Sequence, residues 1–444
     1  MATQPVTSRL RSLSPLSRHL AGDIAALSVV QAINYLVPLI TVPYLVRVLQ
    51  PAHFGLLSFA QGIVLFFSFL TDFGFDYSAT RALAAGRRDP ESLSRIYWPT
   101  LASKLILLCF SAAALFLLAA HVPTMRQASP LIYASFLYVI GTTLFPIWLF
   151  QGTGNLPIAA VLLGAGRLLT VPLLFLFVRN SQDYVIAGGI QASLEVTAGI
   201  LALPITFKRL RVRWYCPSFA DIVKTFAGGW PLFVSGAAIY ASTTSITVLL
   251  GFLSGNEQVG YYSAADKMIK ACIAASTPMA MALYPHIAAL NAESRASALR
   301  TIRKSLTATG GIMLLVSLLA LVLAPYLCPL LLGSSFAPSI AILRLLSPLP
   351  LLYGLMAVLG SQTMVVFGME RELARLTLLS VAITSPVSIV LIVFFGGAGA
   401  AVSSDIQMLL TVGAIMFFLR ASGLCVWRGV SPAAGLLNGE SGVG

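Results

Sequence analysis

Four cations inside long apolar segments have the clearest potential for chemistry. Lys267 and Lys270 are three positions apart, which places them near one face of a helix. Arg167 and Arg344 have no acidic residue close by in the sequence. Charges in apolar segments are rare and usually face a polar interior, so these four are candidate ligands for an anion. Asp266 offers another interpretation, because a packing ion pair with Lys270 at i,i+4 explains this segment equally well, and Arg344 can also snorkel.

Four further acids occupy similar surroundings. Asp72 and Asp76 are one helical turn apart near the end of an apolar segment. They suit a gate, a proton carrier or partners for a basic group on a neighbouring helix. Glu195 and Asp405 are isolated acids that suit a coupling proton or sodium ion, or hydrogen bonds to Ser and Thr neighbours. We expect no cofactor beyond such an ion.

Three more cations lie at the ends of apolar segments. Arg81 follows the Asp72 and Asp76 pair, and Arg47 ends the first apolar segment. Both are candidate contacts for an anionic substrate, although Arg47 can equally anchor at lipid head groups. Lys104 is near a segment end, and we expect it to snorkel to the cytoplasmic interface rather than to form part of a site.

The sequence contains no enzyme motif that would offer another functional site. The 4 histidines and 5 cysteines are dispersed, and no CxxC pair occurs. The sequence has no HExxH metal motif, nucleophile elbow or P-loop. We therefore predict neither a catalytic centre nor a metal site.

Composition places the charges in a membrane protein. Of 444 residues, 58% are hydrophobic and only 10% are charged, whereas soluble domains carry about 25% charged residues. Mean hydropathy is +0.89. The net charge of +13 is better explained by membrane orientation than by nucleic-acid binding, because most cations lie between the apolar segments.

Twelve apolar segments are long enough to cross the bilayer as helices. With both termini in the cytoplasm, 20 of the 28 Lys and Arg residues fall on the cytoplasmic side, and only Arg47, Arg126 and Arg179 fall on the other. This bias predicts a multi-pass membrane protein with both termini in the cytoplasm. The predicted spans are 24–46, 54–76, 99–120, 129–150, 156–178, 184–206, 226–253, 259–289, 306–332, 339–367, 374–395 and 398–419.

The chain is predicted to contain two copies of a six-helix unit. A shift of 205 residues matches Gly55 with Gly260, Ser58 with Ser263 and Ala60 with Ala265. A chance match of small helix-packing residues is the alternative. An even number of spans separates the copies, so they form a parallel repeat. We predict an N-terminal bundle at 1–206, a basic cytoplasmic linker at 207–225, a C-terminal bundle at 226–419 and a cytoplasmic tail at 420–444.

Two stretches, 38–85 and 259–285, resemble the bacterial polysaccharide-repeat flippases of the Wzx type. Gln50 stands where that family has Gly, which alters a turn. The family pattern, P-x-L-x-R-x-L-G-P-x-x-F-G followed by D-x-G-F and A-T-R, is matched by Pro43, Leu45, Arg47, Leu49, Pro51, Phe54 and Gly55, and by Asp72, Gly74, Phe75, Ala79, Thr80 and Arg81.

The resemblance implies an all-α integral membrane fold of two six-helix bundles around a central cavity. It also implies a flippase of the bacterial inner (plasma) membrane for polyprenyl-diphosphate-linked oligosaccharide repeats, which serve O-antigen, capsule or exopolysaccharide synthesis. The implied partners are this substrate, membrane lipids, a polysaccharide polymerase and chain-length machinery. Aromatic residues are candidates to line a sugar path, although packing explains aromatics more often. They include Tyr35, Trp148, Trp230 and Tyr240.

Two other functions stay open. A multidrug exporter belongs to the same superfamily, but its cationic substrates favour an acidic cavity over the five cations found within the spans. A membrane polymerase or ligase of glycan assembly would need a sizeable outer loop, and the predicted outer loops are short.

Overall fold

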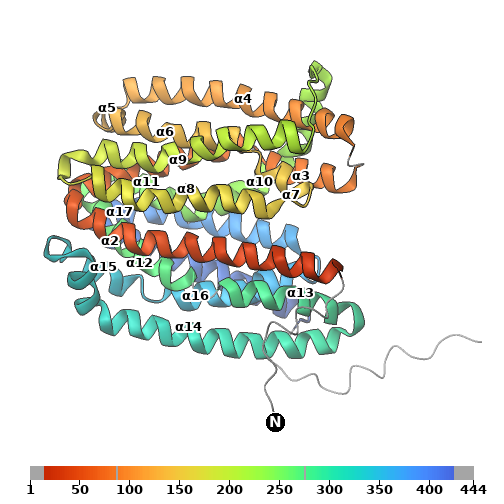
Figure 1. The fold of residues 1–444 in the computed structure, drawn as a ribbon. Helices are drawn as coiled ribbons and strands as arrows, with labels where there is room; N and C mark the ends of the chain where they lie inside the picture. The colour runs from red at the N-terminus through yellow and green to blue at the C-terminus, as the bar shows by residue number, and fades with distance from the viewer. Residues whose placement is uncertain (1–14, 87–88, 275–276, 425–444) are drawn as a thin grey trace, which may run out of the picture. The chain divides into compact units, whose positions relative to one another are not determined.

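The structure is a computed structural model that describes the backbone of residues 15–86, 89–274 and 277–424. In these ranges the chain is helical, without β-strands (Figure 1). Some predicted features lie outside the described residues. They are the side chain of Tyr35 and the cations Arg9, Arg11, Arg87, Arg88 and Arg428 of the charge bias.

Helices follow one another through short turns, as the apolar segments predict. The helices are α2 (Pro15–Asp72), α3 (Phe75–Ala85), α4 (Pro90–His121), α5 (Pro123–Gln127), α6 (Ser129–Leu144), α7 (Ile147–Gly152), α8 (Leu156–Phe177), η2 (Ser181–Asp183), α9 (Tyr184–Pro204), η3 (Ile205–Arg209), α10 (Phe219–Thr243), α11 (Ser245–Leu253), α12 (Asn256–Ala274), α13 (Thr277–Glu293), α14 (Arg295–Leu332), η4 (Ser334–Phe336), α15 (Ser339–Leu345), α16 (Leu349–Met356), η5 (Ala357–Val365) and α17 (Glu370–Ala421).

Eight helical stretches of the described chain are long and apolar enough to cross a membrane. Two of them, in α2 and α17, each hold two predicted spans and break at a residue of positive φ, Gln50 (φ 62) and Gly396 (φ 55). The pairs α10–α11 and α12–α13 cover the predicted spans 226–253 and 259–289. The all-α membrane fold with twelve spans is thus confirmed.

Gln50 occupies a backbone region that favours glycine, at the position where the resembling family has Gly. Its side-chain Nε2 donates a 2.7 Å hydrogen bond to the carbonyl of Arg47, at the end of the preceding helical segment. Pro51 then starts the next segment, where its missing N–H costs nothing. The break is therefore kept despite the substitution, at some cost in backbone strain.

The chain divides into two compact units. The first comprises Met1–Ala264 with Pro329–Ala337, and the second comprises Ala265–Cys328 with Pro338–Gly444. The predicted boundaries at 206, 225 and 419 concern the two repeat copies and stay a prediction. In the first unit, α6 packs along α9, α9 packs on α8, and α2 contacts both α6 and α8 (Figure 1).

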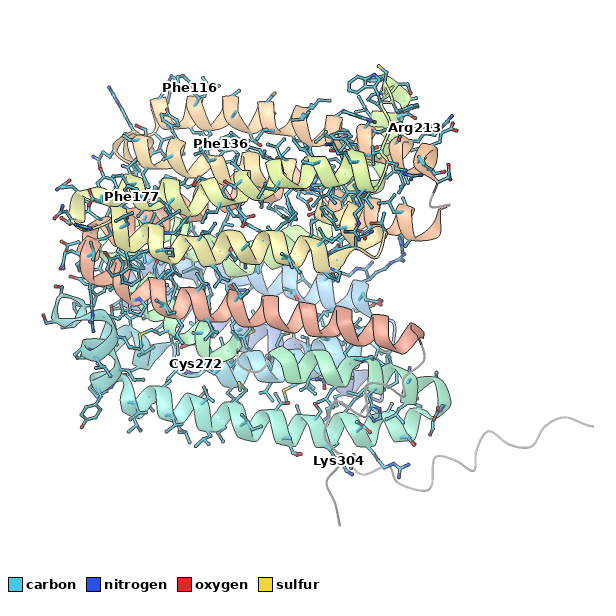
Figure 2. The ribbon with its side chains drawn as sticks, viewed as in Figure 1. Phe116, Phe136, Phe177, Arg213, Cys272 and Lys304 are labelled. Atoms are coloured by element: carbon cyan, nitrogen blue, oxygen red, sulfur yellow. The ribbon has the colours of Figure 1, made fainter. Side chains whose placement is uncertain are left out.

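The linker of the first unit is packed against the N-terminal end of α4. Val212 is 5% exposed in a cluster with Tyr97 and Trp148. The indole N–H of Trp98 donates to the carbonyl of Arg213 at 2.8 Å, while the side chain of Phe116 farther along α4 is exposed (Figure 2). The chain leaving η3 is therefore held in place before α10 begins.

A close helix crossing in the first unit joins residues that the predicted repeat makes equivalent. A Cβ on Gly55 of α2 would collide with the carbonyl of Asn256 and would lie 2.7 Å from the nitrogen of Gly260 in α12. A Cβ on Gly260 would in turn collide with the carbonyl of Pro51. Only glycine allows the two backbones to approach this closely.

The second unit packs α13 and α17 against η5, a π-helical stretch. Leu359 and Met364 of η5 are buried in a cluster with Val412 and Ile415 of α17. Inside the unit, the hydroxyl of Ser305 donates a 2.6 Å hydrogen bond to Oε1 of Gln362. A π-helix in a span is often associated with a functional site.

Candidate functional site

A cavity of about 440 Å³ lies among the helices of the first unit. Residues of α2, α3, α4, α6, α7 and α10 form its wall. The part of the wall that can do chemistry consists of Asp72, Asp76, Lys104, Tyr138, Gln151 and Tyr240.

A turn between α2 and α3 positions the two carboxylates. Phe73 (φ 48) and Gly74 (φ 76) both have positive φ, so α2 ends at Asp72 and α3 starts anew. The carboxylate of Asp72 accepts the backbone N–H of Asp76 at 3.3 Å, and Asp76 itself lies in the first turn of α3, where a helix favours negative charge.

Lys104 of α4 reaches between these carboxylates. Its Nζ lies 2.6 Å from Oδ1 of Asp76 and 3.0 Å from Oδ1 of Asp72. The lysine side chain is only 3% exposed, whereas the acids are 26% and 31% exposed. A buried ammonium with two carboxylate partners avoids the large penalty of an isolated buried charge.

This geometry matches one of the three roles expected for the acids and corrects the prediction for Lys104. Asp72 and Asp76 do pair with a basic group on a neighbouring helix. The expectation that Lys104 snorkels was wrong, because it considered only the distance to the segment end. Thr100, Ser103 and Ser111 are also buried and share the lysine's side of α4. That polar face was the signal in the sequence that marks Lys104 as inward-facing.

A second ion pair joins two predicted candidates. Arg167 of α8 lies 3.9 Å from Glu195 of α9, and the side chains are 40% and 14% exposed. Glu195 therefore pairs with a cation, an option its sequence neighbours did not suggest. Gly141 of α6 lets this part of α9 approach, because a Cβ there would collide with the backbone of Glu195.

The cations of the second unit are arranged separately. Lys270 and Asp266 form the predicted i,i+4 pair at 2.7 Å, with 47% of the lysine side chain exposed. Lys267 is half-buried on the same helix. Arg344 is exposed and lies in the last turn of α15. Their roles as anion ligands stay predictions.

Three remaining candidates lie apart from the cavity. The Arg47 guanidinium donates to the carbonyl of Leu330 in the last turn of α14, and Arg81 is exposed on α3. Asp405 of α17 has a buried Oδ1 without a hydrogen-bond partner among the described residues. The hydroxyl of Ser403 nearby donates to Gly399 instead.

The aromatic candidates differ in their surroundings. Tyr240 lines the cavity and stacks on Phe69, with ring centroids 4.7 Å apart. Trp148 is 2% exposed within a packing cluster, and Trp230 is 55% exposed. Sequence reasoning missed Tyr138 and Gln151, since only the packing of α6 and α7 brings them to the cavity.

Known proteins share both sequence and fold with this chain. Residues 20–291 match the family described as polysaccharide biosynthesis protein. A protein of Escherichia coli (strain K12) named "Putative O-antigen transporter" is 30% identical over 407 residues, covering 92% of this chain and 98% of the relative. A protein of Shigella dysenteriae with the same name is 27% identical over 401 residues, covering 90% and 99%.

Two solved structures share the fold at low identity. An inward-facing multidrug resistance transporter of the MATE family, from the MOP superfamily, has a TM-score of 0.69 at 16% identity and covers 87% of this chain and 95% of its own. The lipid II flippase MurJ in an inward closed conformation has a TM-score of 0.67 at 11% identity, with coverages of 90% and 87%. These likenesses extend to the fold, and the sequence match extends to the family: the chain belongs to the polysaccharide biosynthesis protein family.

Proposed function

We propose that this protein is a flippase that moves polyprenyl-diphosphate-linked oligosaccharide repeats across the bacterial inner membrane. The observation that carries the proposal is a charged, hydroxyl-lined cavity inside the membrane helices of a chain from a polysaccharide biosynthesis family. Relatives named for O-antigen transport, and the fold shared with a lipid II flippase, support the same substrate class.

The physical task is to carry polar groups through about 30 Å of hydrocarbon. Each sugar hydroxyl or phosphate left without a partner there costs several kcal/mol. A polar interior replaces water for the head group, while the polyprenyl chain stays in lipid. No bond forms or breaks, so the protein acts as a transporter and leaves polymerisation to a separate polymerase with its chain-length machinery.

In this proposal the cations contact the substrate at different places. Lys267, Lys270 and Arg344 contact the diphosphate, and the large exposed fraction of Lys270 leaves its ammonium accessible beyond the pair with Asp266. Arg167 is the other candidate within a span. Arg81 and Arg47 meet the substrate at the two membrane faces.

Coupling to a proton or sodium ion is assigned to Asp405 rather than to Asp72 and Asp76. Lys104 already occupies the position between the latter carboxylates. The buried Oδ1 of Asp405 lacks a described partner, which makes its carboxylate the better acceptor for a proton or cation. An Asp405→Asn variant should abolish the dependence of transport on the ion gradient, whereas Asp221→Asn in the linker should retain it.

The sidedness of accumulated substrate tests the flippase proposal. In a deletion strain, single repeats should collect on polyprenyl diphosphate at the cytoplasmic face, unreachable by a lectin added to intact spheroplasts. Repeats reachable from outside would instead indicate a missing polymerase. Normal surface polymer with raised sensitivity to cationic drugs would indicate a multidrug exporter, the candidate that the MATE fold favours.

Reporter fusions test the proposed orientation. A fusion after Arg213 should report cytoplasm, and one after Glu257 should report the periplasm, because the charge bias predicts that both termini are inside. A periplasmic signal after Arg213 would contradict the orientation.

A further inference from the structure

The groups facing the cavity offer hydrogen bonds that nothing in the described chain uses. Both contacts of Lys104 involve the Oδ1 atoms of Asp72 and Asp76, and no described residue donates to their Oδ2 atoms. The Gln151 amide accepts from Thr80 through Oε1 at 3.4 Å, and its Nε2 makes no hydrogen bond to a described residue. The Tyr138 hydroxyl likewise has no hydrogen-bond partner in the described parts of the chain.

The charge of the cavity argues against a phosphate there. Two carboxylates face one ammonium, so the three groups sum to one negative charge. The ammonium is buried and both carboxylates approach it closely, which leaves it poorly placed for a second anion. The remaining negative charge would repel a diphosphate, because like charges are screened less in a cavity than in bulk water.

The same groups match the hydroxyls of a neutral sugar. Carboxylate oxygens accept hydrogen bonds from neighbouring hydroxyls, an amide N–H donates to them, and a phenol does either. Phe69 and Tyr240, whose rings stack on each other, add apolar surface to the wall, against which the C–H groups of a pyranose ring can pack. The volume of about 440 Å³ lies within the range of about 300–1,000 Å³ typical of small-ligand pockets.

We infer that this cavity binds sugar residues of the transported repeat, while the diphosphate is held elsewhere. The inference rests on the proposed flippase function and adds a subsite to it. Asp72, Asp76, Tyr138 and Gln151 then select the sugar by hydrogen bonds, and Lys104 acts as a positioning residue that fixes the two carboxylates.

Binding to the purified full-length protein in nanodiscs tests the subsite. One probe is the repeat oligosaccharide released by mild acid from the host's lipid-linked intermediate, and the other is polyprenyl diphosphate without sugars. Tyr138→Phe and Gln151→Ala should each weaken oligosaccharide binding about fivefold, the effect of one lost hydrogen bond. Binding of polyprenyl diphosphate should not change.

Tyr133→Phe is the matched control, because Tyr133 lies on the same helix α6, is 42% exposed and is outside the cavity wall. The inference is overturned if the wild type does not bind the oligosaccharide, if Tyr138→Phe and Gln151→Ala leave its binding unchanged, or if an organic cation such as tetraphenylphosphonium displaces it in competition. Cytoplasmic accumulation of repeats in the deletion strain would still support the flippase in those cases. Outward accumulation would refute the flippase whatever the binding result.

Discussion

Replacing Lys104 by methionine removes the charge that holds Asp72 and Asp76 together and nearly keeps the volume. Two carboxylates would then face each other at the turn between α2 and α3 without a cation. We expect this variant to be markedly less stable than the wild type, and most of the loss to disappear when the carboxylates are also neutralised.

The magnitude follows from distance and exposure. At 2.6 and 3.0 Å, with an effective dielectric constant of about 20, the two contacts provide roughly 5–6 kcal/mol of direct attraction each. Desolvation of three charges offsets most of this attraction. Loss of one partner from a buried ion pair typically costs about 3–5 kcal/mol. Since the acids are 26% and 31% exposed, we expect a loss of about 3 kcal/mol.

The assay is a double-mutant cycle on protein purified in detergent. The variants are Lys104→Met, Asp76→Asn and their combination, followed by denaturant unfolding in mixed micelles. The coupling free energy between Lys104 and Asp76 should reach about 2 kcal/mol. Glu91 with Arg95 provides the control cycle, because these side chains are 74% and 62% exposed and should couple by less than about 0.5 kcal/mol.

An unchanged stability in Lys104→Met would refute the reasoning, as would a coupling no larger than that of the control pair. Either result would mean that the carboxylates take up protons or water at negligible cost. The substitution Lys104→Arg should retain part of the stability, because charge is kept while the geometry of a single ammonium is lost.

Three other perturbations have expected outcomes. Gln50→Gly should stabilise the protein by about 1 kcal/mol in the same unfolding assay, since glycine relieves the positive φ, and Gln50→Ala should bring no gain. Arg167→Gln should lower the free energy of unfolding by about 2 kcal/mol, because the variant removes the cation that pairs with Glu195. The double variant Arg167→Gln with Glu195→Gln should lose less, and an equal loss would contradict the ion pair. Hydrogen bonds from the backbone and hydroxyl of Ser218 and from Tyr215 lower the pKa of Asp221, so its stabilisation holds above pH of about 4 and is lost as pH falls through the lowered folded-state pKa. Acid should therefore speed protease cleavage within residues 207–218, the part of the linker that precedes α10, and Asp221→Asn should remove this pH dependence.

The fold was predictable because apolar length and loop charge are local properties of the sequence. The breaks at Gln50 and Gly396 fall between predicted spans for the same reason. The site was harder to predict from the sequence, because Lys104 contacts Asp76 only through the packing of α4 on α3. Arg167 and Glu195 were each predicted as isolated charges because their helices had to be packed before the pair was visible.

The wall of the polar cavity was predicted only in part. Asp72 and Asp76 were recognised by their spacing, but Tyr138 and Gln151 belong to apolar or turn segments without any charge pattern. Whether such residues face lipid or a cavity depends on helix rotation. A polar face, like that of Thr100, Ser103 and Lys104, is the local signal from which rotation can be read.

The crossing of α2 and α12 has the form of an interface between identical subunits. Gly55 contacts Asn256 and Gly260 contacts Pro51, and each contact becomes the other when the repeat copies are exchanged. This reciprocity defines an isologous, two-fold contact. A six-helix ancestor could therefore have formed the same crossing as a homodimer, in which a single glycine position of the chain was used by both subunits. Fusion of the two genes would then free each side to change, which accounts for proline at 51 where its counterpart is asparagine.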